Sequence, residues 1–541
     1  MTHMGRNRYY IKTLILILVC ILLTVLSTSC GSKTLKEAQS AFDAGEYEKA
    51  IGIINESEEK IADNEDLKSL YISSYEKWGE ELLASGDYQK TIEVLNDSGL
   101  EMSDGSSLSN IYSDAWHKYM DEKIAEQNYY QAYDLLSKMV GGGIATADES
   151  KETYYQLGEK FSENKQYAAA GLAYAKAGDY SDAAKKCSSS WDKGAFRNTA
   201  CLEDYTAVGI KPDGTVASAV NTDLIDSVEN VSARLNRAGT KIQTKGWTDM
   251  VSVLCNDFYY VGLNSKGQVK VGETGCTVFI PDEKLSTPDW TDVVSIDLHD
   301  ATLAGLTKDG RVLITGDGKN DFAAAEAWEN IIQISLDYDM LSGVDIFGNV
   351  HVINALASHD SYDAEDPYDN PFTEDELQGK NIGQFIGHRN YGVYITKTGE
   401  LSTTATPERA EKIEFKGESS WMDKMMEYDD YKGLSTGKSG VGFVSCDTEY
   451  DYYIGLCSNG TVKVGGDMGS ILEGFGINKW KDIREAHLGM GGNPVVYGIT
   501  DDGTLRLTGY EGGIYMPYHE KIRSWGQLKA PTIEYDTSEF K

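Results

Sequence analysis

The chain has 541 residues, of which 50 are Lys or Arg and 85 are Asp or Glu, so its formal net charge is −35. A chain of this length exceeds one ordinary hydrophobic core, which predicts more than one domain. The negative charge repels phosphate backbones and anionic lipid, so the composition argues against nucleic acid as a partner and fits a soluble, exposed protein.

Residues 1–29 have the pattern of a signal peptide. A basic stretch precedes the apolar run TLILILVCILLTVL, whose length suits a signal peptide better than a full membrane span. The run ends in LSTSCG, which resembles a bacterial lipoprotein signal cleaved before Cys30, although Ser27 stands where an aliphatic residue is commoner. This resemblance implies a lipid on Cys30 and a protein at the outer face of the cytoplasmic membrane. The alternative, an uncleaved anchor, gives the same location.

Six cysteines follow the signal segment. An even number outside the cytoplasm permits disulfides, but buried free thiols are the expectation because Cys is a common small core residue. Cys446 and Cys457 are expected at opposite ends of one strand, too far apart to bond. No Cys or His spacing indicates a metal site, and no cofactor is expected. The six are Cys187, Cys201, Cys255, Cys276, Cys446 and Cys457.

Residues 33–196 have apolar side chains at helical spacing. Four short phrases there each place a Tyr three residues before a small residue: GEYEKA, GDYQKT, QNYYQA and KQYAAA. The Tyr residues are Tyr47, Tyr88, Tyr129 and Tyr167. The pattern resembles tetratricopeptide-type helical hairpins, which implies an α-solenoid whose Tyr and small residues pack between helices. The spacing of 41 residues between the first three exceeds the 34 of that repeat.

From residue 204 the apolar period changes to two, and one hairpin phrase returns seven times. In the copy TLAGLTKDGRV, strands are expected near 301–307 and from 311, with a turn at 308–310. Each copy closes with a glycine suited to a left-handed turn position. These turn glycines are Gly214, Gly267, Gly310, Gly348, Gly399, Gly460 and Gly503.

A second glycine stands five residues earlier in six copies, and Tyr394 takes its place in the remaining one. Glycine weakens a strand interior, so its recurrence predicts close approach of another backbone near the axis of a β-propeller. The six are Gly209, Gly262, Gly305, Gly343, Gly455 and Gly498. Recurring tryptophans are expected to pack as wedges between blades. They are Trp247, Trp290, Trp328, Trp480 and Trp525.

The two ends of this array complement each other. The first copy has no Trp-bearing strand before it, and Trp525 has no hairpin after it. We therefore expect a C-terminal strand to complete the first blade and close a seven-bladed ring without open sheet edges.

The phrase from Trp290 to Val312, W-x-D-V-V-x-I followed by G-L-x-x-D-G-x-V, resembles the repeat of the regulator-of-chromosome-condensation propellers. The resemblance covers about 204–531 and leaves 532–541 as a C-terminal tail. It implies the propeller fold. The nucleotide-exchange activity of the eukaryotic member depends on a wedge and loop residues that have no match here.

These features favour a non-enzymatic, lipid-anchored surface protein that uses its repeats as a binding platform for a protein or glycan. Two insertions, 357–381 and 407–440, are candidate recognition loops. The acidic residues of the first could bind Ca²⁺, although they lack the spacing of a specific calcium loop and a solvated loop is favoured.

Two alternatives remain. One is an extracellular polysaccharide lyase or hydrolase with its site in the propeller channel. No histidine or serine motif of a known catalytic pattern occurs, but catalytic groups far apart in the sequence can converge in a fold. The other is that the helical region docks a peptide while the propeller acts as a spacer.

Overall fold

The computed structural model describes residues 33–540, apart from 58–60, 62–63, 101–105, 228–242, 276–282, 338–339, 356–373, 389–390, 405–439, 450–451, 467–473, 490–494 and 510–514. Cys30, Cys276, residues 357–373 of the first insertion and residues 407–439 of the second therefore lie outside the described residues. The described chain divides into two compact units, one ending at Glu149 and one beginning at Ser150. We call them the helical unit and the propeller unit. No helix among the described residues is long and apolar enough to cross a membrane.

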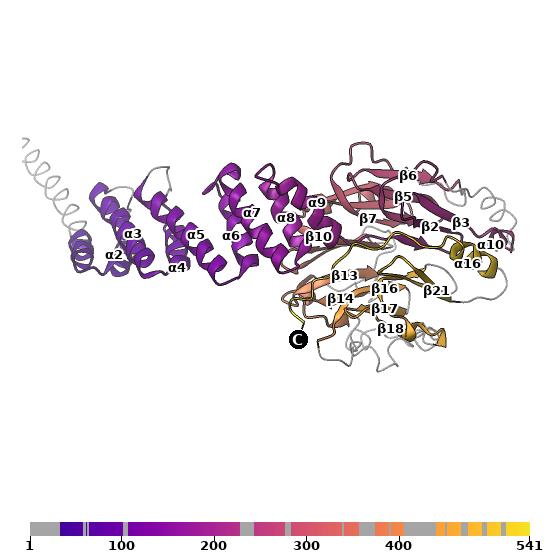
Figure 1. Cartoon of the computed structure of the whole chain (residues 1–541). Coiled ribbons are helices and arrows are strands. Elements are labelled where there is room, and N and C mark those ends of the chain that lie inside the picture. Colours follow the sequence, from indigo (N-terminus) through magenta and orange to yellow (C-terminus); the bar gives the residue numbers. More distant parts are fainter. Residues whose placement is uncertain are drawn as a thin grey trace, which may run out of the picture. The chain divides into compact units, whose positions relative to one another are not determined.

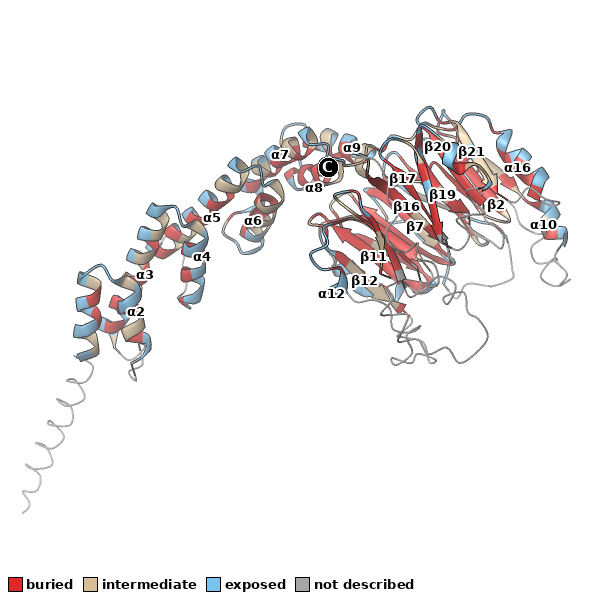
Figure 2. Cartoon of the chain, turned by 90° about the horizontal axis from the view of Figure 1, so that it is seen from below, coloured by how far each residue is buried: buried red, intermediate tan, exposed pale blue. Residues whose placement is uncertain are grey.

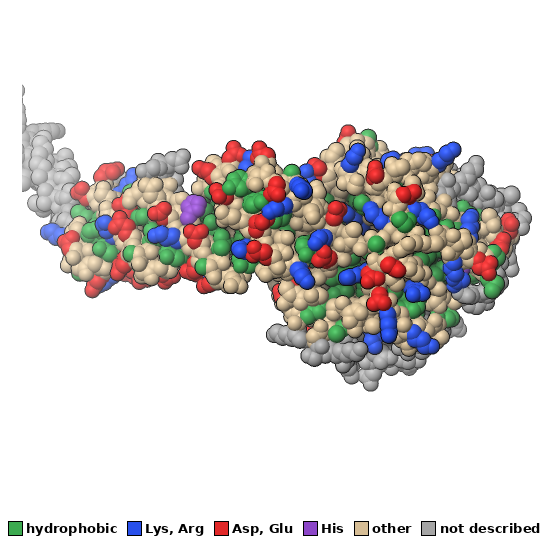
Figure 3. All heavy atoms as spheres, in the orientation of Figure 1, with side chains coloured by type: hydrophobic (Ala, Val, Ile, Leu, Met, Phe, Trp, Pro, Cys, Tyr) green, Lys and Arg blue, Asp and Glu red, His purple; other side chains and the backbone are tan. Residues whose placement is uncertain are grey.

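The helical unit is a succession of antiparallel helices joined by short turns (Figure 1). After a helix over 33–43 come α2 (Tyr47–Asn55), α3 (Glu65–Ser85), α4 (Tyr88–Asp97), α5 (Ser107–Ala125) and α6 (Tyr129–Gly141), and α7 (Ala147–Glu163) begins at its end. Both acidic and basic side chains lie on its surface, and the acidic ones are more numerous (Figure 3). Many form exposed ion pairs three or four residues apart, which contribute little to stability.

The recurring Tyr of each phrase is the first residue of a helix: α2, α4, α6 and α8 (Tyr167–Ala177). A polar residue precedes each one, and the side chains of Asp87 and Asn128 accept hydrogen bonds from the first turns of α4 and α6. The small residue three positions later is fully buried in every case: Ala50, Thr91, Ala132 and Ala170. The helical region is confirmed, whereas the specific likeness to tetratricopeptide repeats stays a prediction.

Seven three-stranded antiparallel sheets form the blades of the propeller. The middle strands are fully buried in most blades, whereas several outer strands, such as the third strand of the second blade, are mostly half-buried (Figure 2). In chain order they are β1–β3 (Ala200–Leu202, Thr206–Ile210, Val216–Val220), β4–β6 (Met250–Cys255, Tyr259–Asn264, Val269–Glu273), β7–β9 (Val293–His299, Thr302–Thr307, Val312–Gly316), β10–β12 (Ile331–Asp337, Met340–Asp345, Val350–Asn354), β13–β15 (Ile382–His388, Tyr391–Thr396, Leu401–Thr403), β16–β18 (Phe443–Glu449, Tyr452–Cys457, Val462–Gly466) and β19–β21 (Ile483–Gly489, Val495–Thr500, Leu505–Gly509).

The first strand of each blade is its inner strand, and neighbouring inner strands contact one another around the ring. Strand β1 lies against both β4 and β19, so the first and seventh blades meet and the ring is closed. The expected fold class, a helical region followed by a seven-bladed propeller, is confirmed. Cys446 and Cys457 lie on two strands, β16 and β17, so the expectation that they share one strand is wrong.

The turn glycines have a second role besides the turn. All seven have positive φ between 73° and 86°. The carbonyl oxygen of each accepts the N–H of the first apolar residue of the next blade, as from Met250 to Gly214 (3.1 Å) and from Ile483 to Gly460 (3.1 Å). At the seventh junction the donor is Leu528, near the C-terminus, which bonds to Gly503 at 2.9 Å. One repeated hydrogen bond therefore joins every blade to the next.

The interior glycines stand in the middle strands of six blades, and the group that approaches most closely is an aromatic ring rather than another backbone in most of them. A Cβ at Gly262 would lie 2.6 Å from the indole of Trp247, and one at Gly305 would lie 2.7 Å from Trp290. The expectation of close backbone packing at the axis was wrong, because the missing side chain makes room for the Trp of the same blade. The matching pairs are Gly343 with Trp328, Gly455 with Phe443, Gly498 with Trp480 and Gly209 with Trp525.

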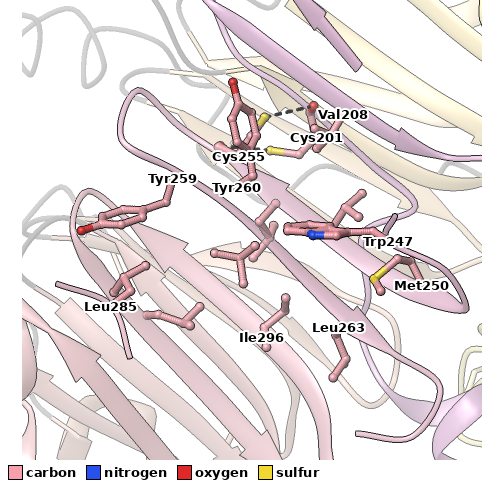
Figure 4. Packing of buried hydrophobic residues seen from close by; sticks show 14 of the residues in the cluster. Cys201, Val208, Trp247, Met250, Cys255, Tyr259, Tyr260, Leu263, Leu285 and Ile296 are labelled. Carbon is pink, nitrogen blue, oxygen red and sulfur yellow. Dashed lines mark hydrogen bonds between the residues drawn. The ribbon is translucent and has the colours of Figure 1, made fainter. Parts of the chain in front are cut away.

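The tryptophans lie where blades meet. Trp247 belongs to a buried cluster that joins Val208 of the first blade, Leu263 of the second and Ile296 of the third (Figure 4). Burial of so much apolar surface between neighbouring sheets is the main force that holds the ring together.

In the first blade, segments from both ends of the array bond to the middle strand β2. The N–H of Lys529 donates to the carbonyl oxygen of Ile210 at 2.7 Å, and the N–H of Ile210 donates to that of Thr199 at 2.9 Å. The C-terminal segment therefore reaches the first blade, but it forms no strand there, and β1 supplies the ladder. Pro531 explains the difference, since it has no N–H with which to continue the ladder.

The last helices of the expected helical region pack within the propeller unit. These are α8 and α9 (Ala183–Gly194). The indole nitrogen of Trp191 donates to the carbonyl oxygen of Lys308 at 3.0 Å, and Nε of Arg197 donates to that of Val294 at 2.9 Å. Both acceptors belong to the third blade.

Candidate functional site: an acidic channel in the propeller

The inner strands surround a channel along the axis of the propeller, with a cavity volume of about 980 Å³. Those residues of the inner strands that pair with the interior glycines are buried between blades, as Val253 and Ala486 are. Their neighbours on either side point the other way, because successive side chains of a strand alternate between its faces. Polar side chains at these neighbouring positions line the channel.

The channel positions form three tiers, with one residue from each blade in a tier. The lower tier consists of Thr199, Ser252, Ser295, Gln333, Gln384, Ser445 and Glu485. The middle tier consists of Cys201, Leu254, Asp297, Ser335, Ile386, Asp447 and His487. The upper tier includes Glu203, Asn256, His299 and Asp337.

Long side chains of the lower tier join one inner strand to the next. Oε1 of Gln384 accepts the N–H of Cys446 at 2.9 Å. At the junction between the last and first blades, Glu485 accepts the N–H of Thr199 at 2.9 Å and its hydroxyl at 2.7 Å. Burial raises the pKa of the Glu485 carboxyl above its usual value. The lower tier therefore contributes to closure of the ring.

Two carboxylates in the middle tier have the same arrangement in different blades. Asp297 accepts the N–H of Leu336 on the next inner strand at 2.9 Å, and Asp447 accepts the N–H of Leu488 on its next strand at 2.9 Å. Burial raises the pKa of Asp297 to about 6, and the negative charge of Asp447 adds to the rise. The two charges therefore repel each other across the channel.

Two histidines in the channel are each paired with a carboxylate. Nδ1 of His299 lies 3.0 Å from Asp337, and Nδ1 of His487 lies 3.6 Å from Asp447. Burial opposes protonation of both rings, but the adjacent carboxylates outweigh it and raise the pKa of each histidine. Nε2 of His487 is buried, without a hydrogen-bond partner and 4.0 Å from Glu485.

The upper end of the channel is strongly acidic. The whole lining contains ten carboxylates against one guanidinium, that of Arg197, and no Lys. Arg197 is bonded to Asp192 at 2.8 Å, so its charge is already compensated. The carboxylates are Glu203, Asp204, Asp257, Asp297, Asp300, Asp317, Asp321, Asp337, Asp447 and Glu485. Such a lining focuses a negative potential in the channel.

The C-terminal tail lies at the lower end. Ile533 and Tyr535 line the cavity there, together with Phe196. The Tyr535 hydroxyl donates to the carbonyl oxygen of Arg484 at 2.8 Å, and Glu534 forms an ion pair with Lys193 at 2.8 Å. The tail and the end of α9 thus cover the lower mouth, and the upper mouth is the acidic one.

The residues singled out from the sequence lie elsewhere. The interior glycines and the tryptophans are in the packed blades, and Cys30, residues 357–373 of the first insertion and residues 407–439 of the second lie outside the described residues. The described cysteines are free and buried: Cys187, Cys201, Cys255, Cys446 and Cys457. Within the described ranges, no group of three His, Cys, Asp or Glu residues is placed to hold a metal ion.

The sequence contained a signal for the channel that we did not use. Polar residues occur two apart on inner strands that are otherwise apolar, as in Asp297 and His299 or Glu485 and His487. In a closed ring these positions must face the axis, because the opposite faces pack between blades.

Comparison with known proteins places the fold in context. No family model matches the chain, and no curated protein matches it. Among solved structures, it is similar to the ectodomain of the receptor kinase CR4 from Physcomitrella patens (10% identity, 58% of this chain, 73% of that chain, TM-score 0.36). It is also similar to Prp20p from Saccharomyces cerevisiae (12% identity, 60% of this chain, 85% of that chain, TM-score 0.34), whose structure was described with its binding to Gsp1p and histones. A third similar structure is YCF48 bound to a D1 peptide (10% identity, 56% of this chain, 90% of that chain, TM-score 0.29). At these identities the likeness concerns the fold.

Proposed function

We propose that this chain is a non-enzymatic interaction protein whose propeller binds a cationic segment of a partner protein at the upper mouth of the channel. The observation that carries the proposal is the composition of the lining, ten carboxylates against one compensated Arg around a cavity of about 980 Å³. Lys and Arg side chains form charge-assisted hydrogen bonds with carboxylates, and desolvation in a cleft strengthens them.

The arrangement favours binding over catalysis. Both channel histidines are engaged by carboxylates, and the orphan nitrogen of His487 is shielded from solvent. A general base needs a ring nitrogen within reach of a substrate proton. The lyase or hydrolase alternative requires a rearrangement of these pairs.

The location belongs to the same proposal. A lipid on Cys30 would hold the chain at the outer face of the cytoplasmic membrane, with the propeller available to surface proteins. The support is the basic, apolar and small-residue pattern that ends in LSTSCG. Metabolic labelling with a fatty acid, compared between wild type and Cys30→Ala, tests it, and equal labelling of both would contradict it.

The binding site is tested with the chain that begins after Cys30 and with Lys-rich or Arg-rich peptides against Glu-rich peptides of equal length. Asp257→Asn and Asp300→Asn remove charge at the upper mouth. Asp300 has φ of 44°, which Asn tolerates, so the change preserves the backbone. We expect each change to weaken binding of basic peptides about threefold to tenfold, most strongly at low salt.

Asp501→Asn is the matched control, because Asp501 is exposed in the turn after β20 and lies outside the channel lining. It should leave the affinity unchanged. Affinity should also fall as the pH drops through about 6, where Asp297 gains a proton. Equal binding of acidic and basic peptides would overturn the proposal, and product release from a polysaccharide would replace it with the enzymatic alternative.

A further inference from the structure

Two thiols face each other where the first and second blades meet. Cys201 lies on β1 and Cys255 at the end of β4. Sγ of Cys201 is 3.4 Å from the carbonyl oxygen of Cys255, and Sγ of Cys255 is 3.4 Å from that of Cys201. The contacts are reciprocal, so each side chain extends toward the backbone of the other residue, and the two sulfur atoms lie close together (Figure 4).

The position matters because the first blade is held together less completely than the others. Its inner strand β1 has three residues, whereas most inner strands have seven, and the start of the ladder comes from the C-terminal segment. On one flank, β1 is bonded through Thr199 to Glu485 of the last blade. On the other flank, its neighbour is β4, and the Cys pair stands at that contact.

We propose that Cys201 and Cys255 form a disulfide that fastens β1 to the second blade. The inference rests on the proposed location outside the cytoplasm, where disulfides persist. Two S–H bonds break and one Sγ–Sγ bond forms. The two electrons and the two protons pass to an oxidant of the disulfide class, a small-molecule or protein disulfide, whose S–S bond breaks to give two thiols.

The bond forms during folding rather than in the finished propeller. In the folded chain a hydrogen bond between the two thiols, together with burial, raises the pKa of Cys201 well above its usual value, so little thiolate is present. Before the ring closes, both thiols are exposed to the oxidant, and the reciprocal geometry then selects this pair.

The other described cysteines lie elsewhere in the fold. Cys187 on α9 contacts the carbonyl oxygen of Gly171 at 3.4 Å. Cys446 and Cys457 belong to the sixth blade. They serve as internal controls, since they should stay free under conditions that oxidise the pair.

The test refolds the chain that begins after Cys30 from the reduced, denatured state in a glutathione redox buffer, in a Cys276→Ser background that leaves five cysteines. Alkylation and peptide mapping by mass spectrometry then locate free and bonded thiols. We expect one disulfide that joins the peptides of Cys201 and Cys255, with Cys187, Cys446 and Cys457 alkylated. Five alkylated thiols, or a disulfide between any other two cysteines, would overturn the proposal.

A second test measures the melting temperature of cysteine variants and does not depend on the peptide mapping. A reductant should lower the melting temperature of the oxidised chain by about 5–10 °C, because the bond closes a loop of 54 residues. Cys201→Ser should abolish this sensitivity, whereas Cys446→Ser should retain it. Equal sensitivity in both variants would contradict the assignment. Refolding tests whether the disulfide forms, whereas the lipid-labelling experiment tests the proposed location, so failure of one can be told from failure of the other.

Discussion

The indole of Trp525 covers the backbone of Gly209, so that a Cβ at residue 209 would lie 2.9 Å from the ring. These residues are more than 300 positions apart, yet they repeat the contact that Trp247 makes with Gly262 within a single blade. The C-terminal segment therefore supplies the first blade with the packing residue that its own sequence lacks.

This contact predicts a coupling between the two positions. Trp525→Ala should lower the free energy of unfolding by about 3–5 kcal/mol through loss of a buried aromatic ring. Gly209→Ala should destabilise the wild type by overpacking but cost little in the Trp525→Ala background, where room has been made. Denaturant unfolding of the four proteins in this cycle measures the coupling. Additive effects would show that the two residues do not share one packing site.

Closure of the ring predicts a graded response at Glu485. Glu485→Ala leaves the buried N–H of Thr199 without its partner and should cost about 1–3 kcal/mol of unfolding free energy. Glu485→Gln retains one acceptor oxygen and should cost less. Glu520→Gln, at an exposed position on α16 (Tyr515–Arg523), is the matched control for loss of a carboxylate. Urea unfolding distinguishes them, and equal stability of all three variants would contradict the role of Glu485.

Asp297 predicts a pH dependence of stability with a definite sign. Its folded pKa of about 6 lies above the value of about 4 in an unfolded chain, so the folded state binds the proton more tightly. The stabilisation is complete below pH about 4 and is lost as the pH rises through about 6, with a total of about 3 kcal/mol. Asp297→Asn should remove this component, so that its stability relative to wild type rises between pH 4 and 7. A constant difference over that range would contradict the raised pKa.

The docking of α9 on the third blade predicts the effect of changes at Trp191. Its indole nitrogen donates a hydrogen bond to the carbonyl oxygen of Lys308. Its ring covers Gly171, where a Cβ would lie 2.7 Å from the indole. Trp191→Phe should cost about 1 kcal/mol for the lost hydrogen bond. Trp191→Ala should cost about 3–5 kcal/mol and accelerate proteolysis near residues 195–199. Unchanged proteolysis in the Ala variant would show that the helix docks without this residue.

The repeat pattern was enough to predict the ring because turn chemistry and spacing are local. A left-handed residue at each turn favours glycine, and seven such turns, each between alternating apolar strands, leave few alternatives to a propeller. The strands around Thr302–Thr307 lie where the sequence pattern predicted them.

The partner of each interior glycine was not predictable in the same way. A strand glycine indicates only that something approaches closely, and both a neighbouring backbone and an aromatic ring satisfy that condition. Trp290 stands 15 residues before Gly305, so their contact depends on how the chain enters the blade. The available signal was the interval of 15 residues between Trp and glycine, which recurs in three blades.

The residues that line the channel were missed for a different reason. Asp297, Asp447 and His487 come from three blades, and none belongs to a recognisable motif. Their proximity is created by the ring itself, which brings equivalent positions of separate repeats to one axis. When the blades are aligned by their interior glycines, Asp297, Asp447 and His487 fall at the same position, which is the middle tier of the channel.

The hydrogen bond from the first residue of one blade to the turn glycine of the blade before it is the same at all seven junctions, including the one formed by Leu528. The bonds that join neighbouring blades therefore do not depend on the blade at which the chain begins. A circularly permuted propeller whose chain begins at another turn would therefore retain the same hydrogen bonds between blades. The position of the chain ends, and with it the point at which the helices are attached, can change without loss of the ring.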